Sequence, residues 1–186
     1  MVDLVAAEAA SVAVALQEVG NLNLLRTFKH LFYPGWWLRR DFPPAELEKI
    51  EQAIAKSEKK HSGEIRFAIE SALPLKALWR DETTIERSIE IFSLLRVWDT
   101  EDNNGALIYL LLADHKVEIT VDRNINKVVE KDEWQRICHL MEAQFKAGHF
   151  SSGVILGINE INQLLEKHFP LRKNDQNELL NKTVIL

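Results

Sequence analysis

The stretch from Trp98 to Arg123 constrains the fold more than any other part of the sequence. It contains an unbroken apolar run over residues 106–113, a polar turn at 114–116, and a segment that alternates apolar and polar residues over 117–121. An apolar run of about eight residues between turn signals is typical of a strand buried on both faces. Alternation is typical of a strand buried on one face only. Because so few residues join the two, they are predicted to form an antiparallel hairpin.

A second strand and a helix precede this hairpin. Residues 64–70 alternate in polarity, which predicts a strand. Thr83 and Glu86 have the spacing of a capping box, which indicates a helix over 82–97. Strand, helix and the strand at 105–113 then form a crossover unit with parallel strands. Further helical patterns predict an α/β fold, an α/β/α sandwich with a central mixed sheet and helices on both faces.

Short motifs in and around the hairpin carry a resemblance to a known family. They are Asp102-Asn103-Asn104-Gly105, Val117-Glu118-Ile119, Asp122-Arg123-Asn124-Ile125, Phe42-Pro43 and the segment 145–154. Their order and spacing over about residues 36–168 resemble the TPM domain family, and the short bacterial members most closely. The resemblance implies an α/β/α sandwich with a mixed sheet.

The chain divides into three parts on these grounds. Residues 1–40 are expected to form an N-terminal helical extension, and residues 41–169 a TPM-like α/β domain. Residues 170–186 turn polar, which predicts a largely flexible tail with a short helical or pairing segment near 179–186.

The segment 21–40 combines basic and aromatic residues. It has four basic residues and no acidic one, a formal charge of +4, and its apolar residues recur at helical spacing. Such a helix is typical of an anchor at a membrane interface. The alternative is that its apolar face docks onto the domain. The residues expected to contact a membrane surface or an envelope protein are Arg26, Phe28, Lys29, Phe32, Trp36 and Trp37.

Composition and charge limit the classes of protein to which this chain can belong. The net charge of −5 disfavours binding to nucleic acid, and the single cysteine allows no intrachain disulfide. No apolar run reaches the roughly 18 residues that span a bilayer. The apolar stretch 4–16 follows Asp3 instead of a basic residue, unlike a secretory signal. We therefore expect a cytoplasmic protein, soluble or peripheral at the inner membrane. The oligomeric state is not indicated.

An acidic loop precedes the buried strand of the hairpin. Asp99, Glu101 and Asp102 lie within four positions, and Asp122 ends the neighbouring strand at the same rim of the predicted sheet. Ca²⁺ and Mg²⁺ prefer oxygen ligands of this kind. These four residues therefore form a candidate cation site. The alternative is a solvated loop in which 103–105 supply the turn geometry.

Arg123 follows Asp122 and could contact a phosphate group at that rim. A thylakoid member of the family is described as an acid phosphatase, so the resemblance implies such an activity here, with Arg123 as the candidate catalytic residue. The chain departs from the family pattern at Trp36-Trp37-Leu38, where many members carry an Asp-rich turn. Many members also carry a Gly-Tyr-Gly-Leu-Glu segment after the second strand of the hairpin, and residues 122–126 of this chain, which stand in that place, do not match it.

The function expected from these observations is a cell-envelope-associated accessory or interaction module that binds a divalent cation. A cation-dependent acid phosphatase acting on phosphomonoesters is the alternative. The six histidines are scattered and are expected on the surface or in loops, and Cys138 lies within an apolar helical stripe, as a core thiol does.

Overall fold

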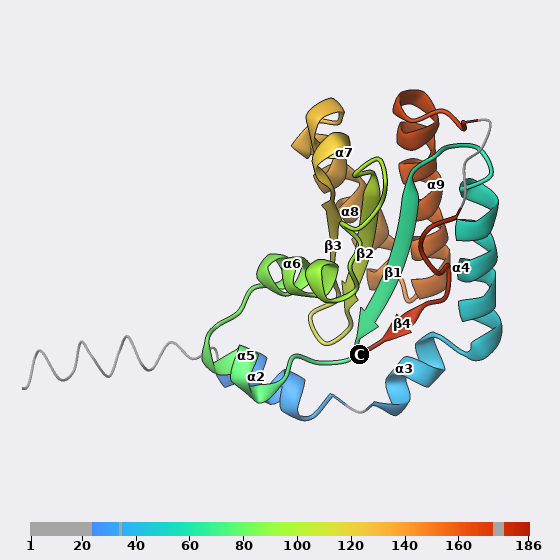
Figure 1. Cartoon of the computed structure of the whole chain (residues 1–186). Helices are drawn as coiled ribbons and strands as arrows, with labels where there is room; N and C mark the ends of the chain where they lie inside the picture. The colour runs from blue at the N-terminus through green and yellow to red at the C-terminus, as the bar shows by residue number, and fades with distance from the viewer. Residues whose placement is uncertain (1–23, 34, 173–176) are drawn as a thin grey trace, which may run out of the picture.

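A mixed four-stranded sheet forms the centre of the computed structural model, which describes residues 24–33, 35–172 and 177–186 (Figure 1). The strand order is β3-β2-β1-β4, and β1 pairs in parallel with both β2 and β4, while β2 and β3 are antiparallel. The strands are β1 (Glu64–Glu70), β2 (Gly105–Leu111), β3 (Lys116–Val121) and β4 (Val184–Ile185). The predicted α/β class, with a parallel crossover and an antiparallel hairpin, is confirmed.

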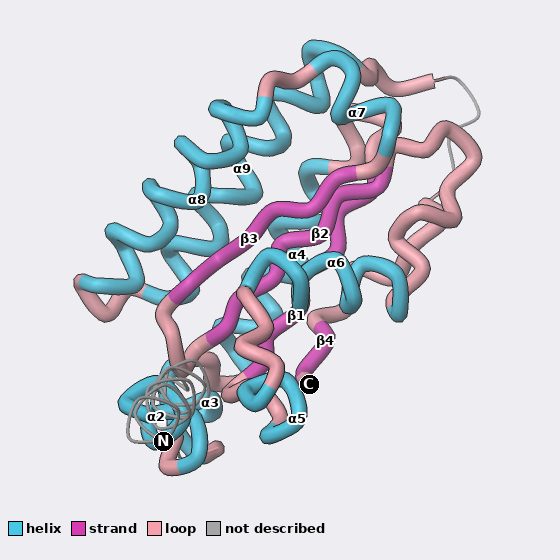
Figure 2. The backbone as a smooth tube through the Cα atoms, turned by 90° about the vertical axis from the view of Figure 1, so that its left-hand side faces the viewer, coloured by secondary structure: helices cyan, strands magenta, loops and turns pink. Residues whose placement is uncertain are grey.

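Helices cover both faces of this sheet (Figure 2). On one face lie α4 (Pro44–Ser57), α8 (Lys131–Lys146) and α9 (Phe150–His168), and on the other lie α5 (Leu75–Trp79) and α6 (Thr84–Leu94). The remaining helices are α2 (Leu24–Leu31), α3 (Trp36–Asp41) and α7 (Arg123–Val128). Sequence patterns did not predict α7. The helical extension expected over residues 1–20 lies outside the described residues.

Strand β2 is the centre of the core because all seven of its residues are buried. Ile108 and Leu110 pack against the layer of α4, α8 and α9, whereas Leu107 and Tyr109 pack against the layer of α5 and α6. The uninterrupted apolar run is thus explained by burial on both faces, as expected.

The acidic loop enters β2 through two unusual backbone positions. Asn103 has a φ of 50°, a conformation that asparagine adopts more readily than most residues. A Cβ on Gly105 would lie 2.0 Å from the carbonyl oxygen of Val97, so only glycine fits. The Asn-Asn-Gly sequence therefore supplies the backbone geometry of this turn.

The second face of strand β3 is less exposed than its alternating sequence predicted. Its second face was expected to be exposed, with Thr120 in solvent, but Thr120 is half-buried and its hydroxyl is hydrogen-bonded to the hydroxyl of Ser88 on α6. The alternating pattern was misleading because Thr and Glu are polar yet can pack beneath a helix when their polar atoms find partners or remain at the edge.

The polar face of β1 is buried as well. Glu70 accepts two hydrogen bonds from the guanidinium of Arg87, at 2.7 and 2.8 Å, and a third from the hydroxyl of Tyr109 at 2.6 Å. Burial and the Glu70 carboxylate together raise the pKa of Tyr109, so its hydroxyl remains a donor. This network fastens α6 to the sheet.

The C-terminal segment is tied to β1 by two further charged residues. Glu64 accepts hydrogen bonds from the backbone N–H groups of Glu178 and Leu179, and Arg66 donates to the carbonyl of Leu180. The described part of the tail, 177–186, thus differs from a largely flexible segment. The expected pairing near its end is β4, beside β1.

The central position of β2 can be tested by truncating Leu110. Leu110→Ala should lower the free energy of unfolding by roughly 2–5 kcal/mol, because it removes buried contacts and leaves a cavity. Leu94→Ala, at a position on α6 that is 67% exposed, should change it by less than about 0.5 kcal/mol. Denaturant unfolding measures both, and similar losses would contradict the assignment.

Candidate functional site

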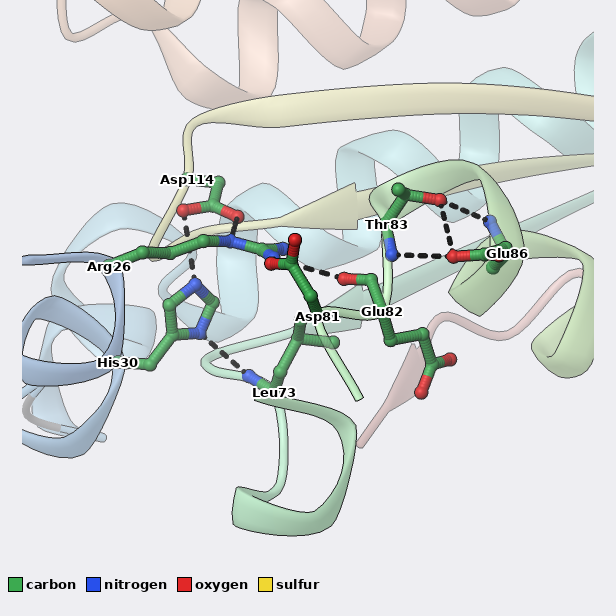
Figure 3. Close-up of polar contacts among 8 residues, drawn as sticks. All are labelled: Arg26, His30, Leu73, Asp81, Glu82, Thr83, Glu86 and Asp114. Atoms are coloured by element: carbon green, nitrogen blue, oxygen red, sulfur yellow. Dashed lines mark hydrogen bonds and ion pairs between the residues drawn. The ribbon is translucent and has the colours of Figure 1, made fainter. Parts of the chain in front are cut away.

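The polar side of α2 is attached to the domain through His30 (Figure 3). The His30 side chain is fully buried, and its Nδ1 accepts a hydrogen bond from the backbone N–H of Leu73 at 2.9 Å. Because Nδ1 is an acceptor, the neutral ring must carry its proton on Nε2. Nε2 therefore donates to Oδ1 of Asp114, which lies 3.0 Å away.

Arg26 reaches the same carboxylate one helical turn earlier. Its Nε donates to Oδ2 of Asp114 at 3.0 Å, and its Nη1 donates to the carbonyl of Glu82 at 3.0 Å. Burial tends to raise the pKa of Asp114, but the hydrogen bonds from His30 and Arg26 and the charge of Arg26 outweigh it and leave the pKa below its usual value. Asp114 is therefore an ionised carboxylate, and it holds α2 through hydrogen bonds to both Arg26 and His30. We call these three residues the Asp114 clamp.

This attachment tests one expectation for the segment 21–40, that the apolar face of its helix docks onto the domain. The alternative in which the apolar face of the helix docks onto the domain is wrong for α2, because its polar face makes the contacts. Arg26, expected to contact a membrane or partner, instead bonds within the protein. The spacing of Arg26 and His30, four residues apart, places them on one side of the helix.

The opposite side of α2 carries large apolar side chains that are exposed to solvent. Leu25 is 83% exposed, and the rings of Phe28 and Phe32 stack with their centroids 6.1 Å apart. These side chains and the exposed Trp36 of α3, the next helix along the chain, are together called the N-terminal apolar surface, which consists of Leu25, Phe28, Leu31, Phe32 and Trp36. Lys29 is also exposed. Helix α5 lies beside α2 at this end of the molecule (Figure 1).

Trp37 has a different environment from Trp36. It is half-buried, its ring and that of Tyr33 form a T-shaped pair with centroids 5.1 Å apart, and the guanidinium of Arg40 lies 5.0 Å from its centroid. The indole therefore helps to seat α3. Trp36 is the tryptophan of this pair that projects into solvent.

The rim of the sheet lies at the opposite end of β2. Here the start of α7 lies beside the acidic loop: Asn124 donates to the backbone carbonyl of Asp102 at 2.6 Å, and Arg123 donates to the side chain of Asn103 at 2.5 Å. The predicted juxtaposition of the loop with the end of β3 is therefore present in the structure.

The acidic side chains of the rim do not converge. Asp99 pairs with Arg96 at 2.5 Å and Asp102 with Arg172 at 2.7 Å, while Glu101 is exposed. Across the described residues no group of three or more His, Cys, Asp or Glu side chains is arranged to hold a metal ion.

Asp122 is the rim residue with an unused ligand atom. Its Oδ1 accepts the N–H of Arg123 at 2.6 Å and begins α7. Its Oδ2 is buried and has no hydrogen-bond partner in the part of the chain that is described. The guanidinium of Arg123 is 80% exposed, so most of its donors remain accessible.

Sequence reasoning missed the clamp. His30 was expected on the surface or in a loop, and Asp114 was assigned only to the turn. The one local signal was the i, i+4 spacing of Arg26 and His30 beside an aromatic face, and it does not identify a partner 84 positions away.

The clamp predicts a local effect of Asp114→Asn. Loss of the charge weakens hydrogen bonds worth about 1.5–3 kcal/mol each, so amide exchange in residues 25–31 should accelerate by about tenfold or more. Asp99→Asn, which removes an exposed ion pair, should leave it unchanged. Unchanged exchange in both variants would contradict the clamp.

The clamp should also depend on pH. Because the folded-state pKa of Asp114 is lowered, its contribution is present above about pH 4, and it is lost as the pH falls through that lowered value. The protection of the amides of residues 25–31, measured relative to their intrinsic exchange rates at each pH, should fall on acidification in the native chain and not in Asp114→Asn.

Comparisons with known proteins agree with the architecture. A family model described as the TPM domain matches residues 41–164. The solution structure of the BA42 protein from the psychrophilic bacterium Bizionia argentinensis is 33% identical, with a TM-score of 0.68 over 76% of this chain and 93% of that one. The N-terminal domain of a P. gingivalis protein is 18% identical and shares the fold, with a TM-score of 0.52 over 69% and 81% of the two chains. No curated protein matches.

Proposed function

This chain belongs to the TPM domain family, and from that premise we propose that it is an accessory module that attaches to an anionic membrane surface through its N-terminal apolar surface. The observation that carries this proposal is the orientation of α2, whose polar side is held by the Asp114 clamp while its aromatic side faces solvent. An exposed apolar patch rimmed by polar residues is typical of an interaction site.

The charge around this surface favours a lipid interface. Lys29 and Arg39 are exposed beside the aromatic side chains, and basic residues near a membrane are attracted to anionic lipid. Aromatic and leucine side chains on an amphipathic helix bury themselves at the boundary of headgroups and acyl chains. The composition and the geometry therefore support the same mode of attachment, in which the helix lies in the plane of the interface.

Nothing in the described ranges forms a helix that could cross a bilayer, since none is both long and apolar enough.

Membrane attachment can be tested by sedimentation with vesicles of phosphatidylcholine and phosphatidylserine. The native chain should sediment with them, and added salt should weaken the binding by screening. Phe28→Glu with Phe32→Glu should reduce binding by about tenfold or more, because charged side chains replace apolar ones at the interface.

Leu94→Glu is the matched control, since Leu94 is equally exposed but lies on α6. It should bind as the native chain does. Equal binding by the control and the double variant would remove the proposal.

A second candidate function is divalent cation binding at the rim, and the unused Oδ2 of Asp122 favours it. A buried carboxylate oxygen without a partner is a costly arrangement that a bound cation would relieve. Asp102 would join this site on release from Arg172. A phosphatase at this rim would use Arg123 to hold the phosphate, since its exposed guanidinium can form a bidentate contact.

Calorimetric titration with Ca²⁺ and Mg²⁺ tests the rim. Binding should be lost in Asp102→Asn with Asp122→Asn and strengthened in Arg172→Gln, because the latter frees Asp102. Asp99→Asn should have the smallest effect, since that side chain is paired with Arg96. Absence of heat in the native chain at millimolar cation would eliminate the site, and with it any cation-dependent hydrolysis of a phosphomonoester.

A further inference from the structure

The outer edge of β3 is an unpaired sheet edge. The N–H of Asp122 donates to the carbonyl of Gly105 at 2.9 Å, so these two residues form a hydrogen-bonded pair at the end of the ladder. Along an antiparallel ladder, hydrogen-bonded pairs alternate with pairs that are not hydrogen-bonded. In this register, the other residues of β3 that are hydrogen-bonded to β2 are Thr120, Glu118 and Lys116. Val117, Ile119 and Val121 therefore direct their N–H and carbonyl groups away from the sheet.

Two helices flank this edge and form a groove of about 520 Å³. Ile85 and Ile89 of α6 line one wall, and both side chains are more than half exposed. Trp134 and Cys138 of α8 line the other wall. Figure 2 shows β3 at the edge of the sheet, with α8 and α6 on its two sides. The groove thus offers apolar walls and a floor whose backbone groups at Val117, Ile119 and Val121 make no hydrogen bond to β2.

Glu118 adds a charge preference to the groove. Its side chain is half-buried and makes no hydrogen bond or ion pair with the rest of the described chain, while Lys116 is already paired with Glu142 at 3.0 Å. Burial and the nearby Glu142 raise the pKa of Glu118, against the opposing effects of Lys116 and Lys131. A basic side chain on a bound ligand would stabilise the ionised form of this carboxylate.

We propose that the edge of β3 is a docking site for one extended segment of a partner protein, which adds a fifth strand to the sheet and places a lysine or arginine opposite Glu118. Main-chain hydrogen bonds to Val117, Ile119 and Val121 provide the affinity, as in other cases of strand addition. Glu118 and Thr120 lie on the face of the sheet that α6 covers, so the aliphatic part of the basic side chain meets Ile85 and Ile89. The residues on either side of it point to the other face, where β-branched side chains meet Trp134 and Cys138. A single strand fits between the two helices, whereas a folded second copy would bring its own α6 and α8 against them.

The thiol of Cys138 lies next to this edge. Burial raises the pKa of its thiol to about 12, against a lowering by a hydrogen bond to the backbone of Ile119. An incoming strand would take over that backbone group. The thiol is thus a neighbour of the docked segment and not a reactive group.

The proposal is tested with a library of blocked heptapeptides added to the full ¹⁵N-labelled chain. The central position is Lys, Arg, Glu or Asp, and the flanking positions are Val, Ile or Thr. Peptides with a basic centre should bind more tightly than those with an acidic centre. On binding, amide exchange of Val117, Ile119 and Val121 should slow by about tenfold or more, while the amides of Glu118 and Thr120, already bonded to β2, should change less.

Variants separate the groove from the rest of the surface. Glu118→Lys should reverse the charge preference, and Ile89→Lys should weaken binding of peptides with a basic centre by about tenfold, because it places a like charge on the face that Glu118 shares. Leu94→Lys, on the same helix beyond the groove, should bind as the native chain does. The proposal is overturned if no library member binds at about 1 mM, if protection does not alternate along β3, or if the free chain dimerises with the same amides already protected.

Discussion

The carboxylate of Asp114 connects the N-terminal helices to the central sheet. It lies three residues beyond the end of β2, in the turn that reverses the chain into β3, where His115 has a φ of 52°. Its two oxygens accept from Arg26 and His30 on successive turns of α2. The position of α2 therefore depends on the register of the hairpin, because a shift of one residue would move the carboxylate to the other side of the turn. The aromatic side of α2 faces solvent as a consequence.

The hairpin also separates two surfaces of the molecule. Strand β2 runs from the acidic rim at Gly105 toward the Asp114 clamp, so the rim and the N-terminal apolar surface lie at opposite ends of the sheet (Figure 1). A molecule attached to a membrane by α2 would present the rim, with Asp122 and Arg123, to the surrounding solution. The groove beside β3 extends between these two ends. This arrangement suits a module that binds a surface at one end and a partner or an ion elsewhere.

Features with local causes could be predicted from the sequence. The capping box of Thr83 and Glu86 forms as expected, since both residues belong to one helical turn. The apolar run of β2 predicted burial on both faces because the turn signals on either side indicate a strand, and neither face of that strand carries a polar side chain. The positive φ of Asn103 agrees with the backbone preference of asparagine. Gly105, in contrast, is required by the close approach of the Val97 carbonyl oxygen.

Features with distant causes could not be predicted in this way. An amphipathic pattern indicates that one face of α2 is apolar, yet the face that docks is chosen by Asp114, 84 positions from His30. The order of the C-terminal segment likewise depends on Glu64, 114 positions from Glu178. Polar residues that bind buried partners have no periodic signature, so the alternating pattern of β3 suggested an exposed Thr120 where α6 in fact covers it.

The depth of α2 in a bilayer tests the account most directly. The single native cysteine is buried with a raised pKa, so a cysteine introduced at the surface can carry a spin label selectively. On anionic vesicles, a label at Leu25→Cys should become accessible to oxygen and shielded from a water-soluble nickel chelate. A label at the equally exposed Leu180→Cys should stay accessible to the chelate. Equal accessibility of both labels to the nickel chelate would contradict attachment through the N-terminal apolar surface.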